Sequence, residues 1–257
     1  MSIREIDELF TQALSGAYED DAPWEAVHAL RAIGTWQVFE RAAELCKSTD
    51  PLSRARGADV LAQLGKTSEH RADRFLEESY SVITDLVRRE TEIQPLSAAI
   101  AALGQLDNPL AVPLITNFSS HSSPEVRFDV AFALGCFPND RRSAETLLQL
   151  TQDKDKDVRD WATFALGVLG DADSAEIREA LVRLLNDSDE NVREEAMVGL
   201  GKRKDQRVVT TLLASLGQPA TTVRVIQTAY LMLGMEGEQK GWTKDDYAAA
   251  LRQCFSR

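Results

Sequence analysis

Apolar residues recur along most of this chain at the spacing of a helix with one buried face. In the segment 174–187, for example, Ile177, Ala180 and Leu184 lie three or four residues apart. Ser174, a residue type that favours the start of a helix, stands at the beginning of this segment. No segment of four to eight residues alternates between polar and apolar positions as a half-buried strand would. The pattern predicts an all-α protein.

The helical segments are copies of one repeat. Four of them align on a Val-Arg pair: PEVRFDVAFALG (124–135), KDVRDWATFALG (156–167), ENVREEAMVGLG (190–201) and TTVRVIQTAYLMLG (221–234). The Val-Arg pairs lie 32, 34 and 31 residues apart, and weaker copies precede them. A glycine closes each copy, at Gly34, Gly65, Gly104, Gly135, Gly167, Gly201 and Gly234. Because these seven are half of the 14 glycines in the chain, their common phase indicates a true internal repeat.

A second helical segment precedes each Val-Arg segment, so the repeating unit is an outer helix, a turn and an inner helix. About seven such pairs fit the chain, with a capping helix at 242–257. The outer segment 69–90 is longer than the others, and we expect this irregularity to bend the stack. One helix pair cannot bury its apolar stripe alone, so neighbouring pairs must stack. The sequence therefore predicts one α-solenoid (superhelix) domain over residues 1–257, with its strongest repeats at 107–235.

The frame V-R-x-x-A-x-x-A-L-G at a period near 32 residues resembles the short HEAT-like repeat named after phycocyanobilin lyases. The resemblance covers at least residues 20–235 and is specific for the fold. It says little about function, because that family includes lyase subunits, scaffolds and inhibitors. The wording VRFDVAFALG followed by DKDVRDWATFALG is similar to a group of small bacterial HEAT proteins, some of which are immunity proteins encoded beside polymorphic toxins. This resemblance implies a protein-binding role.

A helical wheel of the second Val-Arg segment predicts its core face. Val158, Ala162, Ala165, Leu166 and Leu169 fall within an arc of about 100°, whereas Arg159, Thr163 and Gly167 fall opposite. Leu134, Leu166 and Leu200 share one phase of three successive inner helices, and we expect them to be buried.

The inner helices are apolar over a wider arc than one buried stripe needs, which indicates that a neighbour or a ligand covers the excess. Asp129, Trp161 and Glu195 occupy one register, so stacking would align aromatic and acidic side chains along a concave face. The candidate binding residues on this face are Phe128, Asp129, Phe132, Asp160, Trp161, Phe164, Glu194, Glu195 and Tyr230. Such carboxylates and rings suit Arg or Lys of a partner. The alternative is that Trp161, Phe132 and Phe164 only fill the groove between helix pairs.

An arginine follows the valine in every strong repeat, at Arg127, Arg159, Arg193 and Arg224. These arginines could form a basic binding ladder. Their recurrence at one structural phase favours the other interpretation, in which each bonds a carboxylate or a helix end in the neighbouring repeat.

The charge of the chain, −12 with an isoelectric point near 4.8, disfavours nucleic acid as a partner and favours a basic protein. The three cysteines are widely spaced without a C-x-x-C motif, which suits a reducing cytoplasm. Neither a signal peptide nor an apolar run of about 18 residues is present, so we expect a cytoplasmic protein, a monomer, with no membrane contact.

No nucleotide-binding or hydrolase motif is found, so no catalytic residue is assigned. The histidines lie far apart, at His28, His70 and His121, and neither a metal site nor a cofactor is expected.

The sequence predicts a non-enzymatic protein-binding module, with an immunity or inhibitor protein against a basic toxin as its specific form. One alternative is a phycobiliprotein lyase or assembly-factor subunit. Another is a HEAT-like DNA glycosylase, which Asp160 beside Trp161 would suit but the acidic face opposes.

Overall fold

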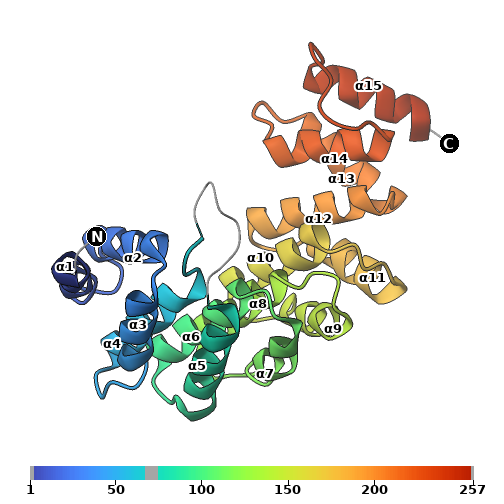
Figure 1. The fold of residues 1–257 in the computed structure, drawn as a ribbon. Coiled ribbons are helices and arrows are strands. Elements are labelled where there is room, and N and C mark those ends of the chain that lie inside the picture. The colour runs from blue at the N-terminus through green and yellow to red at the C-terminus, as the bar shows by residue number, and fades with distance from the viewer. Residues whose placement is uncertain (1–2, 67–74, 256–257) are drawn as a thin grey trace. The chain divides into compact units, whose positions relative to one another are not determined.

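The protein is described by a computed structural model that covers residues 3–66 and 75–255 (Figure 1). The described residues contain fifteen α-helices and no strand, as the sequence predicts. The helices belong to two compact units, residues 1–137 and 138–257. Each unit is built from consecutive helix pairs.

The first unit holds four pairs, each an outer helix followed by an inner one. The first three pairs are α1 Ile3–Ala13 with α2 Asp21–Ile33, α3 Trp36–Leu45 with α4 Pro51–Ala62, and α5 Leu76–Arg89 with α6 Ile93–Gln105. The fourth pair is α7 Val112–Thr116 with α8 Pro124–Gly135, and a 3₁₀ turn at Pro109–Ala111 precedes α7. The inner helices α4, α6 and α8 pack in that order, each also against its own outer helix. The first part of the long outer helix predicted at 69–90 lies outside the described residues, and α5 begins at Leu76.

The second unit holds three pairs and the cap. Their bounds are α9 Arg141–Leu150 and α10 Lys156–Phe164 with a π-helical turn at Ala165–Leu169, α11 Ala175–Leu184 and α12 Glu190–Lys202, α13 Val209–Leu216 after a 3₁₀ turn at Gln206–Val208 and α14 Val223–Leu233, and α15 Lys244–Phe255. The inner helices α10, α12 and α14 pack in that order, and α15 covers α13 and α14. The predicted capping helix therefore forms, two residues later than its predicted start.

The glycines that close the repeats have two structural roles. Gly34 ends α2 in the left-handed region at φ +54°, where a side chain would be strained. Gly104 instead lies where α6 crosses α8, and a Cβ atom there would lie 2.6 Å from Cα of Ala133. The second role explains why glycine recurs even where the helix does not end at it.

The recurring arginines tie each inner helix to the turn before it. In four repeats the arginine Nη1 donates to the backbone carbonyls six and five residues earlier, at Arg54, Arg127, Arg159 and Arg193. Two of these arginines also reach the next repeat, where Arg54 pairs with Glu90 and Arg159 pairs with Asp187. The predicted bond to a neighbouring repeat is thus confirmed for Arg159, whereas the bonds of Arg193 lie within its own repeat.

Most of the predicted core face of α10 is buried, and so are Leu134, Leu166 and Leu200. The prediction for Leu169 is wrong, because its side chain is 40% exposed. The Gly170 N–H bonds the Ala165 carbonyl five residues back at 2.9 Å, and this π-helical turn rotates Leu169 away from the core. Thr163, on the opposite side of the wheel, is buried as well, since α12 covers that side of α10.

Candidate functional site

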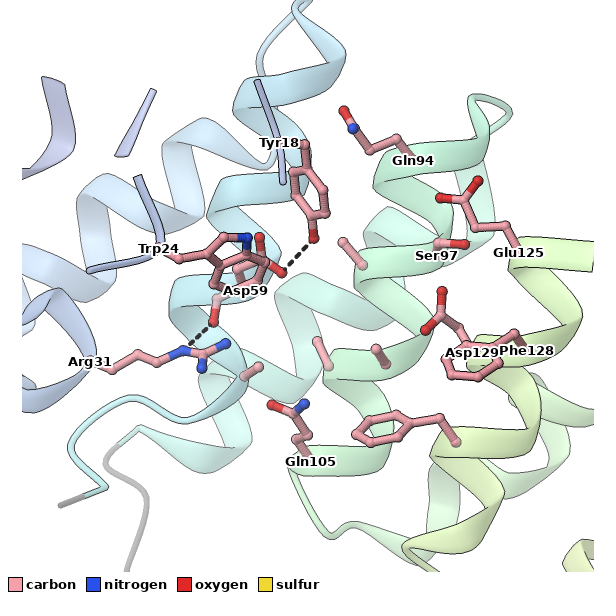
Figure 2. Close-up of a pocket in the computed structure, with 15 residues that line it drawn as sticks. Tyr18, Trp24, Arg31, Asp59, Gln94, Ser97, Gln105, Glu125, Phe128 and Asp129 are labelled. Carbon is pink, nitrogen blue, oxygen red and sulfur yellow. Dashed lines mark hydrogen bonds between the residues drawn. The ribbon is translucent and has the colours of Figure 1, made fainter. Parts of the chain in front are cut away.

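A pocket of about 300 Å³ opens in the first unit, between two groups of side chains that face each other (Figure 2). We call it the Asp129 pocket. Its lining residues are Tyr18, Trp24, Arg31, Asp59, Ala62, Gln94, Ser97, Ala98, Ala101, Ala102, Gln105, Glu125, Phe128, Asp129 and Phe132. They come from the α1–α2 loop and from the inner helices α2, α4, α6 and α8, so consecutive repeats build one cavity.

The wall formed by α2, α4 and the loop before α2 is organised by a buried arginine. The Arg56 side chain is 0% exposed, and its guanidinium lies over the rings of Tyr18 and Trp24, 4.5 and 4.7 Å from their centroids. Its Nη2 donates to the Tyr18 carbonyl at 2.7 Å, which fixes the loop. Arg56 is thus held by stacking and hydrogen bonding within the wall.

Asp59 is the carboxylate of this wall. It accepts a hydrogen bond from the Tyr18 hydroxyl at 3.0 Å and pairs with Arg56 at 3.5 Å. Burial raises its pKa to about 6, although Arg31 and Arg56 oppose the rise. Arg31 also donates from Nε to the Asp59 carbonyl at 2.8 Å. The positive charges of this wall are therefore already matched by Asp59 and by backbone oxygens.

The opposite wall carries Phe128, Asp129 and Phe132 on α8, all of them predicted binding residues, with Glu125 one turn earlier. Burial raises the pKa of Asp129 to about 7, and the nearby charges of Glu125 and Asp59 add to the rise. The Ser97 hydroxyl on α6 moderates it, although no hydrogen bond of regular geometry joins the two. Among the described residues, no Arg, Lys or His forms an ion pair with Asp129. This wall therefore holds a partly buried carboxylate that lacks a counter-charge.

The other predicted binding residues lie in the second unit. The rings of Trp161 and Phe164 contact each other with centroids 5.5 Å apart, and both side chains are partly buried. Asp160 beside them is partly buried too, and burial raises its pKa. Tyr230 lies partly buried on α14. These residues keep some exposure and can contact a partner.

Glu194 and Glu195 differ from the prediction, because the structure buries them instead of presenting them on a surface. They are 6% and 2% exposed. Glu194 accepts a hydrogen bond from Thr222 at 2.8 Å, and Glu195 pairs with Arg224 at 2.5 Å. The physical reason is that α14 packs against α12 and covers both carboxylates. Arg224 thereby departs from the other recurring arginines, since its partner is a carboxylate on the preceding inner helix.

The structure thus divides the predicted stripe between the two units. Phe128, Asp129 and Phe132 belong to the first unit, while Trp161 and its neighbours belong to the second. Within the first unit, sequence analysis missed the wall opposite Asp129. Its signal was present in the weak repeat RARGADVLAQLG, where Arg56 and Asp59 stand among apolar residues of the inner helix.

Two negative observations bear on other kinds of site. The described residues contain no cluster of three or more His, Cys, Asp or Glu side chains placed to hold a metal ion. Within residues 3–66 and 75–255, no helix is both long and apolar enough to cross a membrane.

Comparison with known proteins gives consistent results. A family model described as HEAT repeats matches residues 81–167 and 144–234, more than half of the chain. The Escherichia coli (strain K12) protein YibA is 29% identical over 210 residues, which cover 79% of this chain and 72% of YibA. The X-ray structure of E. coli YibA superposes with a TM-score of 0.73 at 23% identity, covering 96% of this chain and 91% of that one.

A shorter match connects the chain to a lyase subunit. The phycocyanobilin lyase subunit alpha of Thermosynechococcus vestitus is 34% identical over 84 residues, which are 33% of this chain and 30% of the subunit. The archaeal HEAT-like repeats protein of Thermococcus onnurineus NA1 has a TM-score of 0.53 at 17% identity, over 96% of this chain and 98% of that one. The solved structures of YibA and of the archaeal protein share the helical repeat fold with this chain.

Proposed function

Because this chain belongs to the HEAT-repeat family, whose stacked helices form extended binding surfaces, we propose that it is a non-enzymatic module that binds a basic protein. The observation that carries the proposal is Asp129, a partly buried carboxylate on a pocket wall without a counter-charge from the described residues. Removing an unpaired carboxylate even partly from water is unfavourable, and a positive group from a partner would relieve that cost. The binding site is therefore the Asp129 pocket and its rim.

The charge of the whole chain supports a basic partner. Three carboxylates and one guanidinium line the pocket, so the local charge has the same sign as the net charge of −12. Such a field raises the encounter rate with a positive surface and repels nucleic acid. We further propose that the protein acts in the cytoplasm as a monomer.

The specific form of the proposal is an inhibitor or immunity protein that neutralises a basic toxin. Its support is the resemblance of the segments at 126–135 and 155–167 to small bacterial immunity proteins with HEAT repeats. A toxin that acts on nucleic acid needs positive side chains at its substrate site. An acidic module with a carboxylate on a pocket wall can cover such a site.

The test is affinity capture from the native cell with three baits: the wild-type chain, Asp129→Asn and the control Asp7→Asn. Asp7 is an exposed aspartate of α1 in the same unit. We expect wild type and Asp7→Asn to retain the same basic protein and Asp129→Asn to lose most of it, with all three baits melting as folded proteins. An acidic captured protein, or equal retention by the three baits, would contradict the proposal.

A second candidate function is a lyase or assembly-factor subunit for phycobiliproteins, which the match to the phycocyanobilin lyase subunit alpha favours. The test is co-expression with phycocyanobilin followed by purification. A bilin absorption band that co-purifies in stoichiometric amount would support this candidate. The absence of such a band, together with capture of a basic protein, would favour the first proposal.

A further inference from the structure

Two buried polar atoms of the Asp129 pocket lack a partner of regular geometry. They are Oγ of Ser97 and Oε1 of Gln105, and neither makes such a hydrogen bond with a described residue. Both side chains belong to α6, where Ser97 lies near Asp129 and Gln105 lies about two turns further along the helix (Figure 2). Buried polar atoms in folded proteins are nearly always satisfied, so each of them indicates a polar group that the described residues do not supply.

The two arginines near the pocket do not supply a positive charge to Asp129. Arg56, behind the pocket wall, is held by the Tyr18 and Trp24 rings and by the Tyr18 carbonyl. Arg31, which lines the pocket, donates to the Asp59 carbonyl and reaches Gln63 Oε1 at 3.4 Å. Figure 2 shows Arg31 and Trp24 on the wall opposite Asp129. A positively charged donor for Asp129 must therefore come from outside the described residues.

The remaining surface of the pocket is apolar. Phe128 and Phe132 line it from α8, and Ala98, Ala101 and Ala102 line it from α6. The volume of about 300 Å³ is at the small end of the range for ligand pockets, which suits one extended side chain. A ligand that fits must combine a long apolar stem with a positively charged end that donates several hydrogen bonds.

We propose that the Asp129 pocket receives the side chain of one arginine of the partner protein. The inference rests on the proposed function and specifies how the partner is recognised. A guanidinium presents five N–H donors in one plane, enough to bond both carboxylate oxygens of Asp129 and the neighbouring Ser97 hydroxyl. Its flat face packs on aromatic rings such as Phe128, and its weak hydration lowers the cost of entering a confined cavity.

A lysine fits this cavity less well. Its ammonium is a compact and strongly hydrated charge, and it must keep close contacts around a single nitrogen. A planar guanidinium can bond both oxygens of the Asp129 carboxylate and still present donors to Ser97 on the neighbouring helix, whereas an ammonium cannot form this two-bond fork. The arrangement therefore selects arginine over lysine.

The experiment titrates the full-length, ¹⁵N-labelled protein with three small probes: N-acetyl-arginine methylamide, the lysine analogue and the uncharged citrulline analogue. Binding is followed by the side-chain amide signals of Gln94 and Gln105 and the indole N–H of Trp24, all of which line the pocket. Asp129→Asn is compared with Asp7→Asn, and melting curves check that both variants are folded.

We expect saturable shifts with the arginine probe, at least about tenfold weaker binding of the lysine and citrulline probes, and at least about tenfold weaker arginine binding to Asp129→Asn. Asp7→Asn should bind as wild type does. Equal binding of lysine and arginine, an arginine affinity independent of Asp129, or no saturable shift would each overturn the inference. If one of these occurs while capture of the basic partner still depends on Asp129, the arginine inference fails and the proposed function stands. If capture is also independent of Asp129, both fail.

Discussion

Arg159 on α10 and Asp187 in the turn between α11 and α12 form an ion pair in which Nε and Nη2 each lie 2.9 Å from a different carboxylate oxygen. Both side chains are largely shielded from solvent, and the pair joins one repeat to the next. Arg54 and Glu90 form the equivalent two-bond pair in the first unit, at 2.6 and 3.0 Å. The pair is thus a recurrent connection between stacked repeats.

Removing Arg159 should lower the free energy of unfolding substantially. Arg159→Ala removes the counter-charge of the largely buried Asp187 and the side-chain donor of two turn carbonyls, and we expect it to lower the free energy of unfolding by about 2–4 kcal/mol in a urea melt. Arg141→Ala is the control, because Arg141 pairs with Glu145 on an exposed surface and its removal should change the free energy of unfolding little. Similar losses for the two variants would contradict the structural role of Arg159.

The two leucines at the end of α10 provide a test of the π-helical turn. Leu166 is 1% exposed, and Leu166→Ala should cost about 2–5 kcal/mol of unfolding free energy. Leu169→Ala should cost less than about 1 kcal/mol, because the turn leaves that side chain partly in solvent. Chemical denaturation of both variants measures the difference. If Leu169→Ala lowers the free energy of unfolding as much as Leu166→Ala does, Leu169 is buried and the helix continues as the helical wheel assumed.

Because the carboxylates of Glu194 and Glu195 on α12 are buried, we expect their substitution to affect the stability of the fold. Glu195→Lys places a second positive charge beside Arg224 in a closed site, and we expect it to lower the free energy of unfolding by at least about 3 kcal/mol. Glu190→Lys in the same helix is the matched control, because Glu190 is exposed and its replacement should change stability little. Unchanged melting of Glu195→Lys would show that the carboxylate is accessible after all.

Asp129 should make stability depend on pH in a direction opposite to that of an ordinary ion pair. Its pKa is about 7 in the folded chain, against about 3.9 in an unfolded chain. The stability that the neutral form contributes is therefore present below about pH 4 and is lost as the pH rises to about 7.

Asp129→Asn removes this penalty. At pH 8 the variant should be more stable than the wild type, on the order of 1–3 kcal/mol, whereas at pH 4 the two should be nearly equal. Thermal melts at both pH values, with Asp7→Asn alongside, measure the effect. A variant less stable than the wild type at pH 8 would mean that Asp129 has a counter-charge in the folded protein.

The sequence was sufficient to predict the helix pairs, the capping helix and the buried leucines, because each depends on a local pattern repeated seven times. The binding residues were harder to predict, since a helical wheel places side chains on faces but does not say which faces a neighbour covers. Glu194 and Glu195 share a phase with Asp160 and Trp161, yet α14 covers only the former pair. The Arg56 wall depends on contacts with Tyr18, 38 residues away, which no periodicity within one repeat reveals.

Trp161 is the predicted binding residue whose role a single variant can decide. Its ring lies on Phe164, and its side chain stays partly exposed. If the ring is an interface anchor, Trp161→Ala should speed dissociation of the captured partner by the equivalent of about 2 kcal/mol or more, with little change in association. Trp242→Ala is the control, because Trp242 also lies on a neighbouring ring, that of Tyr247, and is partly exposed. Binding kinetics at two ionic strengths, with unfolding midpoints measured on the same samples, separate the two roles. A lowered midpoint with unchanged dissociation would show that Trp161 fills the groove between α10 and its neighbours and takes no part in binding.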